Sequence, residues 1–363
     1  MKVNFNVLNR GYYKFQNEYN NAVISALESG WYILGKEVES FERNFKGFIG
    51  SNHAVGVNSG LDALILALRA LNIKNGDEVI VPANTYIATV LAITENGATP
   101  IFVEPDAYYN LDAQAIEAKI SETTKAIMVV HLYGQTAKMD ALKAVADKHD
   151  LYLVEDCAQS HGSKFNGQTS GTFGDVGCFS FYPTKNIGAF GDGGAIVTDN
   201  KDIADKVRML RNYGSKIKYH NEVQGINSRL DEIQAALLNV KLSHYNELRE
   251  ERAVIAKKYL DEIDNPKITL PKIRKNADTV WHLFVIRTDN RDSLQKYLSE
   301  QGIGTQIHYP IPPHLSQAYE NLGYKQGDFP ITEQYAETAL SLPLYDGMTF
   351  QEAEYVIQMI NKF

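Results

Sequence analysis

The chain has 363 residues, of which 44% are hydrophobic and 22% are charged, and its formal net charge is −8. This composition is ordinary for a globular protein, and the length suffices for two or three domains. The negative charge argues against broad nucleic-acid binding, which needs a basic surface, but a few local donors could still hold an anionic small molecule.

The first predicted helix covers residues 16–29 and is closed by Gly30. The stretch SGWYILG follows and places residues 31–34, three of them bulky and apolar, between two glycines. One interpretation is a turn that packs into the core. The other is a contact surface toward a partner subunit or a ligand, because aromatic rings with a polar edge suit such places.

Residues 57–71, VNSGLDALILALRAL, carry leucine and isoleucine at helical spacing. Ser59 is predicted to cap this helix, with Asp62 in the position of a capping-box partner. The Ser-Gly start also offers free backbone N–H groups and a positive dipole end, which together suit a phosphate. Gly60 would allow an anion to approach the backbone.

Short apolar runs then alternate with helical patterns. Strands are predicted at 78–81, 101–103, 126–132 and 151–154, and helices at 87–95, 113–119 and 139–147. This alternation predicts a parallel sheet with helices on both faces, and ligands bind such sheets at the carboxyl ends of the strands. Polar and aromatic residues cluster at those ends, which predicts a functional edge: Asn84, Tyr86, His131, Tyr133, Glu155, Asp156, Gln159, His161, Ser180, Tyr182 and Lys185.

The stretch 177–194, GCFSFYPTKNIGAFGDGG, follows the same pattern with a lysine after a strand. Lys185 could be an ordinary surface lysine in a turn, or an amine held near a carbonyl compound as a Schiff-base nucleophile. The glycines after it precede a strand, which is the wrong context for a Rossmann or P-loop turn. We expect them to let the backbone pass close to a cofactor and a partner subunit.

The rest of the chain predicts a second domain. Residues 225–242 read as a helix, and a charged helix over 245–263 bridges to a strand at 280–287, a helix at 291–301, the stretch GIGTQIHYPIPPH and two short helices. We therefore expect a large domain at 1–245 and a small α+β domain at 246–363. The chain has no internal repeat and no low-complexity tract.

The polar edge has the parts that a pyridine cofactor with a phosphate would need. Lys185 could form the imine, Asp156 could hold the ring nitrogen protonated, and the ring of Tyr86 could cover the cofactor. Gln159 could donate to its phenolate oxygen. Three residues could bind its phosphate: Gly60, Leu61 and Ser180.

These motifs together resemble the DegT/DnrJ/EryC1/StrS family of sugar aminotransferases, which depend on pyridoxal 5′-phosphate. The resemblance runs from SGWYILGKEVESFE through VNSGLDAL, VPANTYIAT, VEDCAQSHGS and FSFYPTKNIGAFGDGGAIVT to GINSRLDEIQAA and GTQIHYPIPPH. It implies an α/β fold of the fold-type-I aminotransferases, with a large mixed, mostly parallel sheet flanked by helices. It also implies a homodimer with shared active sites, in which Asn227 reaches the phosphate of the neighbouring subunit's cofactor.

Within the family, FYPTKNIGAFGDGG looks most like enzymes that aminate C3 of a dTDP-linked 3-keto-6-deoxyhexose in deoxysugar biosynthesis, such as that of an O-antigen or S-layer glycan. L-Glutamate is the implied amino donor, and Lys185 the general base and acid. The candidates for substrate contact are Tyr32, His161, Tyr182, Arg229, His308 and Tyr309.

Three alternatives remain open from the sequence. The first is a 4-keto-sugar aminotransferase of the same family, and the second is a non-catalytic regulatory protein that binds pyridoxal phosphate. The third is an amino-acid aminotransferase, which would need an arginine for the substrate carboxylate, and the sequence does not assign one.

No segment has the 18 apolar residues of a membrane span, and the N-terminus lacks an apolar signal region, so we expect no membrane or secretory segment. Cys157 and Cys178 give neither a disulfide framework nor a CxxC spacing. We therefore expect a cytoplasmic protein without a metal site.

Overall fold

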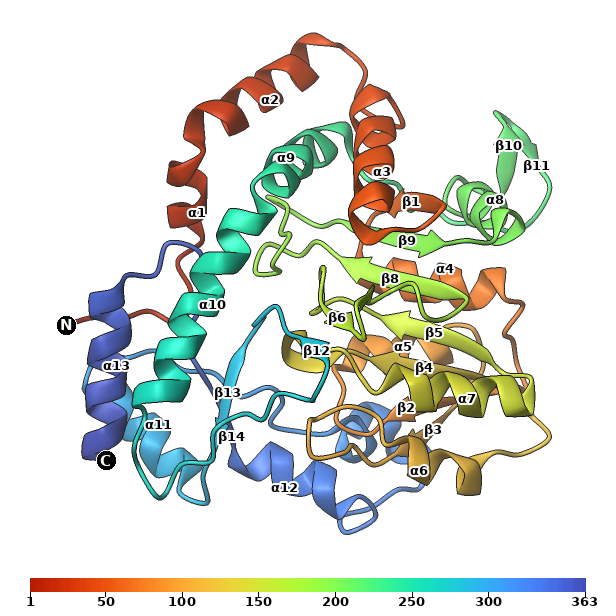
Figure 1. Ribbon diagram of the computed structural model, residues 1–363. Helices are drawn as coiled ribbons and strands as arrows, with labels where there is room; N and C mark the ends of the chain where they lie inside the picture. The colour runs from red at the N-terminus through yellow and green to blue at the C-terminus, as the bar shows by residue number, and fades with distance from the viewer.

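A seven-stranded sheet organises the large domain in this computed structural model, which describes residues 1–363 (Figure 1). β9 runs in the direction opposite to the other strands, so the sheet is mixed and mostly parallel, as predicted. The spatial order is β1 (His53–Val57), β9 (Gly194–Thr198), β8 (Val176–Ser180), β5 (Tyr152–Asp156), β4 (Thr124–Val130), β2 (Glu78–Pro82) and β3 (Thr99–Val103).

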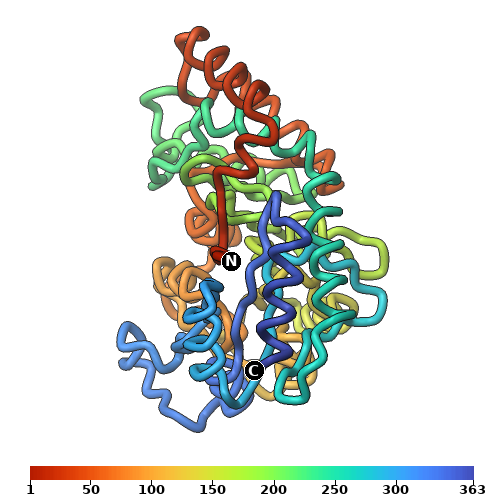
Figure 2. The backbone as a smooth tube through the Cα atoms, turned by 90° about the vertical axis from the view of Figure 1, so that its left-hand side faces the viewer, coloured from red at the N-terminus to blue at the C-terminus, as the bar shows by residue number.

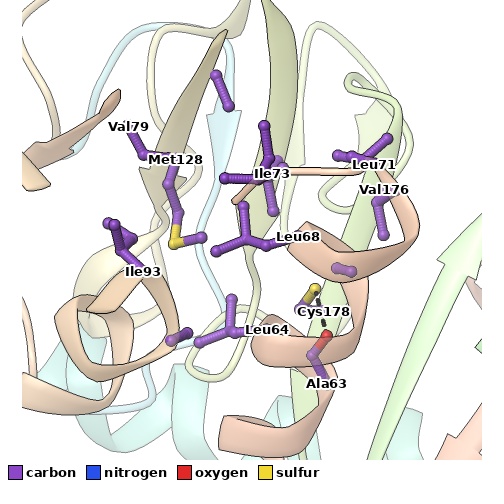
Figure 3. Close-up of a cluster of buried hydrophobic side chains, with 14 of the residues drawn as sticks. Ala63, Leu64, Leu68, Leu71, Ile73, Val79, Ile93, Met128, Val176 and Cys178 are labelled. Carbon is purple, nitrogen blue, oxygen red and sulfur yellow. Dashed lines mark hydrogen bonds between the residues drawn. The ribbon is translucent and has the colours of Figure 1, made fainter. Parts of the chain in front are cut away.

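Alternate residues of the strands face opposite sides of the sheet and build separate hydrophobic clusters. On one side, Val79 and Met128 pack against the leucines of α4 (Gly60–Ala70) and against α5 (Ile87–Thr94), as Figure 3 shows. On the other side, Ile80 and Ile127 belong to the cluster of α7. The further helices of this domain are α3 (Lys36–Ile49), α6 (Ala113–Ile116), α7 (Met139–His149), α8 (Lys201–Leu210) and α9 (Glu232–Ser243).

The second core belongs to the C-terminal part of the chain, beginning with α10 (Tyr245–Glu262), at the start of which the proposed domain boundary falls. The N-terminus belongs to this core too, since the side chain of Val3 is part of its hydrophobic cluster. The amide of Val3 also donates to the carbonyl of Gly302 over 2.9 Å. Figures 1 and 2 show the start of the chain lying beside the last helix. The other elements of this part are β13 (Phe284–Arg287), α11 (Arg291–Glu300), α12 (Pro330–Thr338), β14 (Ala339–Leu342) and α13 (Phe350–Lys362).

Several elements were not predicted or start elsewhere. The helix expected from 225 begins only at Glu232, because Asn227 and Asp231 form extended bridges with Asn212 and Ile33. The unpredicted elements are α1 (Leu8–Lys14), the strands β6 (Lys164–Phe165), β7 (Gln168–Thr169) and β12 (Ala277–Asp278), the hairpin β10 (Ser215–Ile217) and β11 (His220–Asn221), and β1, α3, α8 and β14. The first predicted helix is α2 (Gln16–Glu28), and the 3-10 helices are η1 (Glu117–Lys119), η2 (Leu132–Gly134), η3 (Pro313–Leu315) and η4 (Gln317–Leu322). None of the helices combines the length and the apolar character that a bilayer span requires.

A buried carboxylate joins α9 to the start of α3. Glu232 is 3% exposed and accepts hydrogen bonds from the backbone amides of Gly35, Glu37 and Val38 at 2.7, 2.9 and 3.0 Å. These amides are among those that a helix start leaves without partners, and the positive end of the helix favours a negative group there. Glu232 therefore fixes the end of the SGWYILG stretch.

Replacing Glu232 with glutamine should lower the free energy of unfolding by about 1–3 kcal/mol, because an amide nitrogen would face a backbone N–H. Urea denaturation measures this change. Glu39→Gln is the matched control, since Glu39 is exposed in the first turn of α3, the helix whose start Glu232 binds, and it should change stability by less than about 0.5 kcal/mol. Equal effects of the two substitutions would contradict the role of Glu232.

Candidate active site

A cavity of about 730 Å³ lies at the carboxyl edge of the parallel strands. Each strand that was predicted to deliver polar groups to this edge contributes to its wall, but β4 does so with Leu132. The predicted polar residues Asn84, His131, Tyr133 and Glu155 do not line the cavity. Residues after β2, β4, β5 and β8 line it: Thr85 and Tyr86, Leu132, Asp156 and Gln159, and Ser180, Tyr182 and Lys185. The small domain closes the cavity with His282, Gln306, His308 and Tyr309.

Lys185 stands on the loop that follows β8, where its backbone amide donates to the carbonyl of Tyr182 over 2.8 Å. Burial lowers the pKa of Lys185 from 10.5 to about 8, although attraction to Asp156 acts in the opposite direction. A sizeable fraction of the side chain is thus a neutral amine near pH 8. This is the form that a nucleophile or general base requires.

Asp156 ends β5 and faces the same cavity. Its Oδ2 accepts from the hydroxyl of Thr89 over 2.9 Å, and its Oδ1 from the amide of Ala158 over 3.1 Å. Burial raises the pKa of Asp156, and these two donors and Lys185 only partly offset that rise. A cationic ring nitrogen would therefore find a carboxylate that lacks a full counter-charge.

Both polar atoms of the Gln159 side-chain amide form hydrogen bonds. Its Oε1 accepts from the amide of Tyr133 over 2.7 Å, and its Nε2 donates to the hydroxyl of Tyr309 over 3.1 Å. This fixes the orientation of the amide and leaves the second N–H of Nε2 for a ligand. The predicted donor role of Gln159 is compatible with this geometry.

The topology of the sheet brings the amine and the carboxylate together. β5 and β8 are neighbouring parallel strands, so the residues that follow Asp156 and Ser180 leave the sheet at the same edge. The small domain is tied to this edge by the bond from Gln159 to Tyr309 and by the hydroxyl of Tyr133, which donates to the carbonyl of His308. A shift of the small domain would therefore reorient Gln159 as well as the cavity wall that the small domain supplies.

The phosphate residues also lie together. Ser59 caps α4 by accepting from the amide of Asp62 over 3.1 Å, and the helix start leaves the amides of Gly60 and Leu61 without intrahelical partners. A Cβ at Gly60 would lie 2.5 Å from that of Ser180, so only glycine brings this helix start so close to the serine. One cavity thus contains the groups that pyridoxal phosphate needs. They are an amine, a carboxylate, a side-chain amide and hydrogen-bond donors for a phosphate.

The predicted contact residues divide into two groups. Tyr86, Tyr182, His308 and Tyr309 line the cavity, and the rings of Tyr86 and Tyr309 have centroids 5.0 Å apart. Burial, followed by Lys185, lowers the pKa of His308 to about 4, so this side chain is neutral at pH 7. Tyr32, Asn227 and Arg229 lie outside the cavity of their own chain, as does His161.

His161 does not lie at the cavity surface. It is fully buried, its ring packs near the rings of Phe179 and Phe181, and burial lowers its pKa to about 3. Its placement in the core does not support the expected contact with substrate. His131 and Glu155 are likewise buried and bond to each other over 2.8 Å instead of facing the cavity.

Sequence reasoning missed several wall residues. Phe5 and Asn6 reach the cavity from the N-terminal segment, and no local pattern announces them. Thr85 lines the cavity, and Thr89 lies behind its wall, where it bonds to Asp156. Both stand in the stretch NTYIAT near Tyr86, so their position close to a predicted site residue was a signal that could have been used.

Comparison with known proteins identifies the family of this chain. The model of the DegT/DnrJ/EryC1/StrS aminotransferase family matches residues 14–361. A dTDP-3-amino-3,6-dideoxy-alpha-D-galactopyranose transaminase from Aneurinibacillus thermoaerophilus is 51% identical, with 96% of each chain covered. The erythromycin biosynthesis sensory transduction protein EryC1 of Saccharopolyspora erythraea is 48% identical, with 98% of each chain covered.

The solved structures include S. venezuelae DesV in complex with a ketimine intermediate. It superposes with a TM-score of 0.98 at 46% identity, covering 99% of this chain and 98% of that one. Fold and site therefore define a pyridoxal-phosphate-dependent aminotransferase of fold type I. The chain belongs to the DegT/DnrJ/EryC1/StrS aminotransferase family.

The lowered pKa of Lys185 predicts its reactivity in the cofactor-free protein. Labelling by an amine-reactive anhydride, followed by mass spectrometry between about pH 6 and 10, should reach half of its maximum near pH 8, where the neutral amine becomes the main form. Asp156→Asn should move that midpoint to lower pH, because the attraction that favours the ammonium is lost.

Lys201 is the internal comparator, because its ion pair with Asp205 raises its pKa and its labelling should need a higher pH. A midpoint for Lys185 near the ordinary value of 10.5 would contradict the lowering of its pKa by desolvation.

Proposed function

We propose that the protein transfers an amino group from L-glutamate to a dTDP-3-keto-6-deoxyhexose, giving a dTDP-3-amino-3,6-dideoxyhexose for deoxysugar biosynthesis. The observation that carries this is the complete set of Lys185, Asp156, Gln159, Gly60 and Ser180 around one cavity. The C3 position and the dTDP group are supported by the named activity of the relative that is 51% identical.

The chemistry follows from the state of the side chains. Pyridoxal phosphate, when bound, supplies a carbonyl group that accepts the amino group and a ring that withdraws electrons. Lys185, as a neutral amine, moves a proton to and from its Nζ. Asp156 holds a proton at the ring nitrogen, and Gln159 donates through Nε2 to the phenolate oxygen of the cofactor. Gly60 and Ser180 fix the phosphate end, so the reacting atoms stay beside Lys185.

Three side chains of the cavity wall suit a deoxysugar. Tyr182, His308 and Tyr309 combine hydrogen-bonding atoms with ring faces, and we assign them to the hexose. The Nδ1 of His308 is 2.8 Å from the hydroxyl of Ser341, which fixes the ring. Arg229 stays a candidate for the diphosphate of the substrate, although in one chain it donates to the side chain of Asn212 over 3.1 Å.

Two alternatives keep some support. A 4-keto-sugar aminotransferase would use the same cofactor residues and differ only in how the hexose lies. A regulatory role has the name of EryC1 in its favour. Against it stands the presence of Lys185, Asp156 and Gln159 together in one cavity, because a protein without turnover does not need all three.

We further propose a cytoplasmic homodimer with shared active sites. Asn227 and Tyr32 are exposed and lie outside the cavity of their own chain, as expected for residues that serve a partner's cavity or interface. Both cysteines are buried and free, which suits a reducing compartment.

The purified holoenzyme should convert a dTDP-3-keto-6-deoxyhexose and L-glutamate into a 3-amino sugar and 2-oxoglutarate, identified by NMR of the product. Lys185→Ala should lower the rate by about 10²–10⁴-fold, because the base that moves the proton is lost. It should also abolish the visible absorbance that L-glutamate bleaches in the wild-type protein.

The control substrate is the corresponding dTDP-4-keto sugar, whose product is compared with that of the 3-keto sugar. Amination only at C4 would refute the proposed substrate while leaving the aminotransferase class intact. A wild-type protein that stays colourless with added pyridoxal phosphate would refute the whole proposal.

Shared sites predict complementation between two defective chains. Lys185→Ala and Asn227→Ala proteins, each poorly active at limiting cofactor, should regain activity when they are unfolded and refolded together. A mixed dimer contains one cavity with an intact Lys185 and an intact Asn227 from its partner. If the mixture shows only the mean of the two separate activities, Asn227 does not serve the neighbouring cavity.

A further inference from the structure

Two buried threonine hydroxyls form a chain that ends on Asp156, and the proposed function does not use them. Thr85 Oγ1 lies 2.7 Å from Thr89 Oγ1, which lies 2.9 Å from Asp156 Oδ2. All three side chains are buried. Polar groups removed from water in this way are costly unless each finds a partner, so the chain is a built feature of the site.

The direction of these hydrogen bonds follows from chemistry. An ionised carboxylate only accepts, so the hydroxyl of Thr89 must give its single proton to Asp156. The oxygen of Thr89 can then only accept, and Thr85 is its donor. The amide of Ala158 serves the other carboxylate oxygen over 3.1 Å. Each oxygen of Asp156 keeps a further lone pair for a ligand in the cavity.

The turn that begins α5 brings both hydroxyls together. Thr85 precedes the N-cap residue Tyr86, and Thr89 lies in the first turn of the helix, so their hydroxyls meet over 2.7 Å across the helix start. The amide of Thr89 donates to the carbonyl of Tyr86 over 3.1 Å, which fixes this turn. The segment that presents the ring of Tyr86 to the cavity therefore also presents the hydroxyls to Asp156.

The hydrogen bond from Thr89 lowers the pKa of Asp156. A hydrogen bond to the charged form of a carboxylate stabilises it, and Thr89 opposes the rise in the pKa of Asp156 that burial causes. A proton shared between Asp156 and a ring nitrogen moves toward the more basic partner. By making the carboxylate less basic, the hydroxyl keeps that proton on the ring.

We propose that Thr89 is a positioning residue that orients Asp156 Oδ2 and keeps the ring nitrogen of the cofactor protonated, with Thr85 fixing the direction of the Thr89 hydroxyl. This inference rests on the cofactor dependence and the place of Asp156. It does not depend on which keto sugar or amino donor the enzyme uses.

The test compares Thr89→Val, which keeps the shape and removes the hydroxyl, with Thr89→Ser, which keeps the hydroxyl. Each holoenzyme is loaded with pyridoxal phosphate labelled with ¹⁵N in the ring, and the ¹⁵N chemical shift and the dissociation constant of the cofactor are measured. In Thr89→Val the signal should move toward the unprotonated range, and affinity should fall about 10- to 100-fold. Thr89→Ser should stay close to wild type.

Thr85→Val gives a second, independent reading, because it leaves Thr89 in place but removes its donor. We expect a smaller change of the ¹⁵N shift in the same direction, and this variant decides the matter if Thr89→Val does not fold. A wild-type shift and affinity in the valine variants would overturn the proposal, as would a Thr89→Ser protein that behaves like Thr89→Val. No substrate is needed, so an incorrect sugar assignment cannot produce either result.

Discussion

The site depends on the attraction between two charges in one cavity, the carboxylate of the buried Asp156 and the ammonium form of the partly buried Lys185. Each loses hydration in the cavity, which raises the pKa of the acid and lowers that of the amine. Their mutual attraction offsets part of both penalties without cancelling either. What remains is an acid that favours a cationic partner and a lysine that readily gives up its proton, and both properties suit transamination.

Much of this arrangement could be predicted from the sequence, because alternating strand and helix patterns determine which strand ends meet. Lys185, Asp156, Gln159 and Ser180 lie at or shortly after the ends of buried strands, and all four line the cavity. His161 shows the limit of that reasoning. It precedes Gly162, which has a φ of +76°, and its ring packs against core phenylalanines instead of facing the ligand.

Contacts between distant segments could not be predicted from the sequence, because local patterns do not encode them. Phe5 and Asn6 enter the cavity only because Val3 pairs with residues of the small domain, and such pairing has no local signature. The late start of α9 has the same cause, since long-range bridges keep Asn227 and Asp231 extended where the local pattern favours a helix. Local periodicity thus predicted the strands and their edge, while tertiary pairing decided where the segments between them lie.

Two of the glycines that follow Lys185 allow close backbone contacts within the chain. A Cβ at Gly188 would lie 2.4 Å from the carbonyl oxygen of Pro183, so this glycine allows the loop to fold back on itself around Lys185. A Cβ at Gly194 would lie 2.3 Å from the carbonyl oxygen of Ser59, at the start of α4. Close backbone approach at these two points holds the lysine loop against the helix start that carries Gly60. The backbone contacts of these two glycines therefore place the amine and the anion donors beside the same cavity.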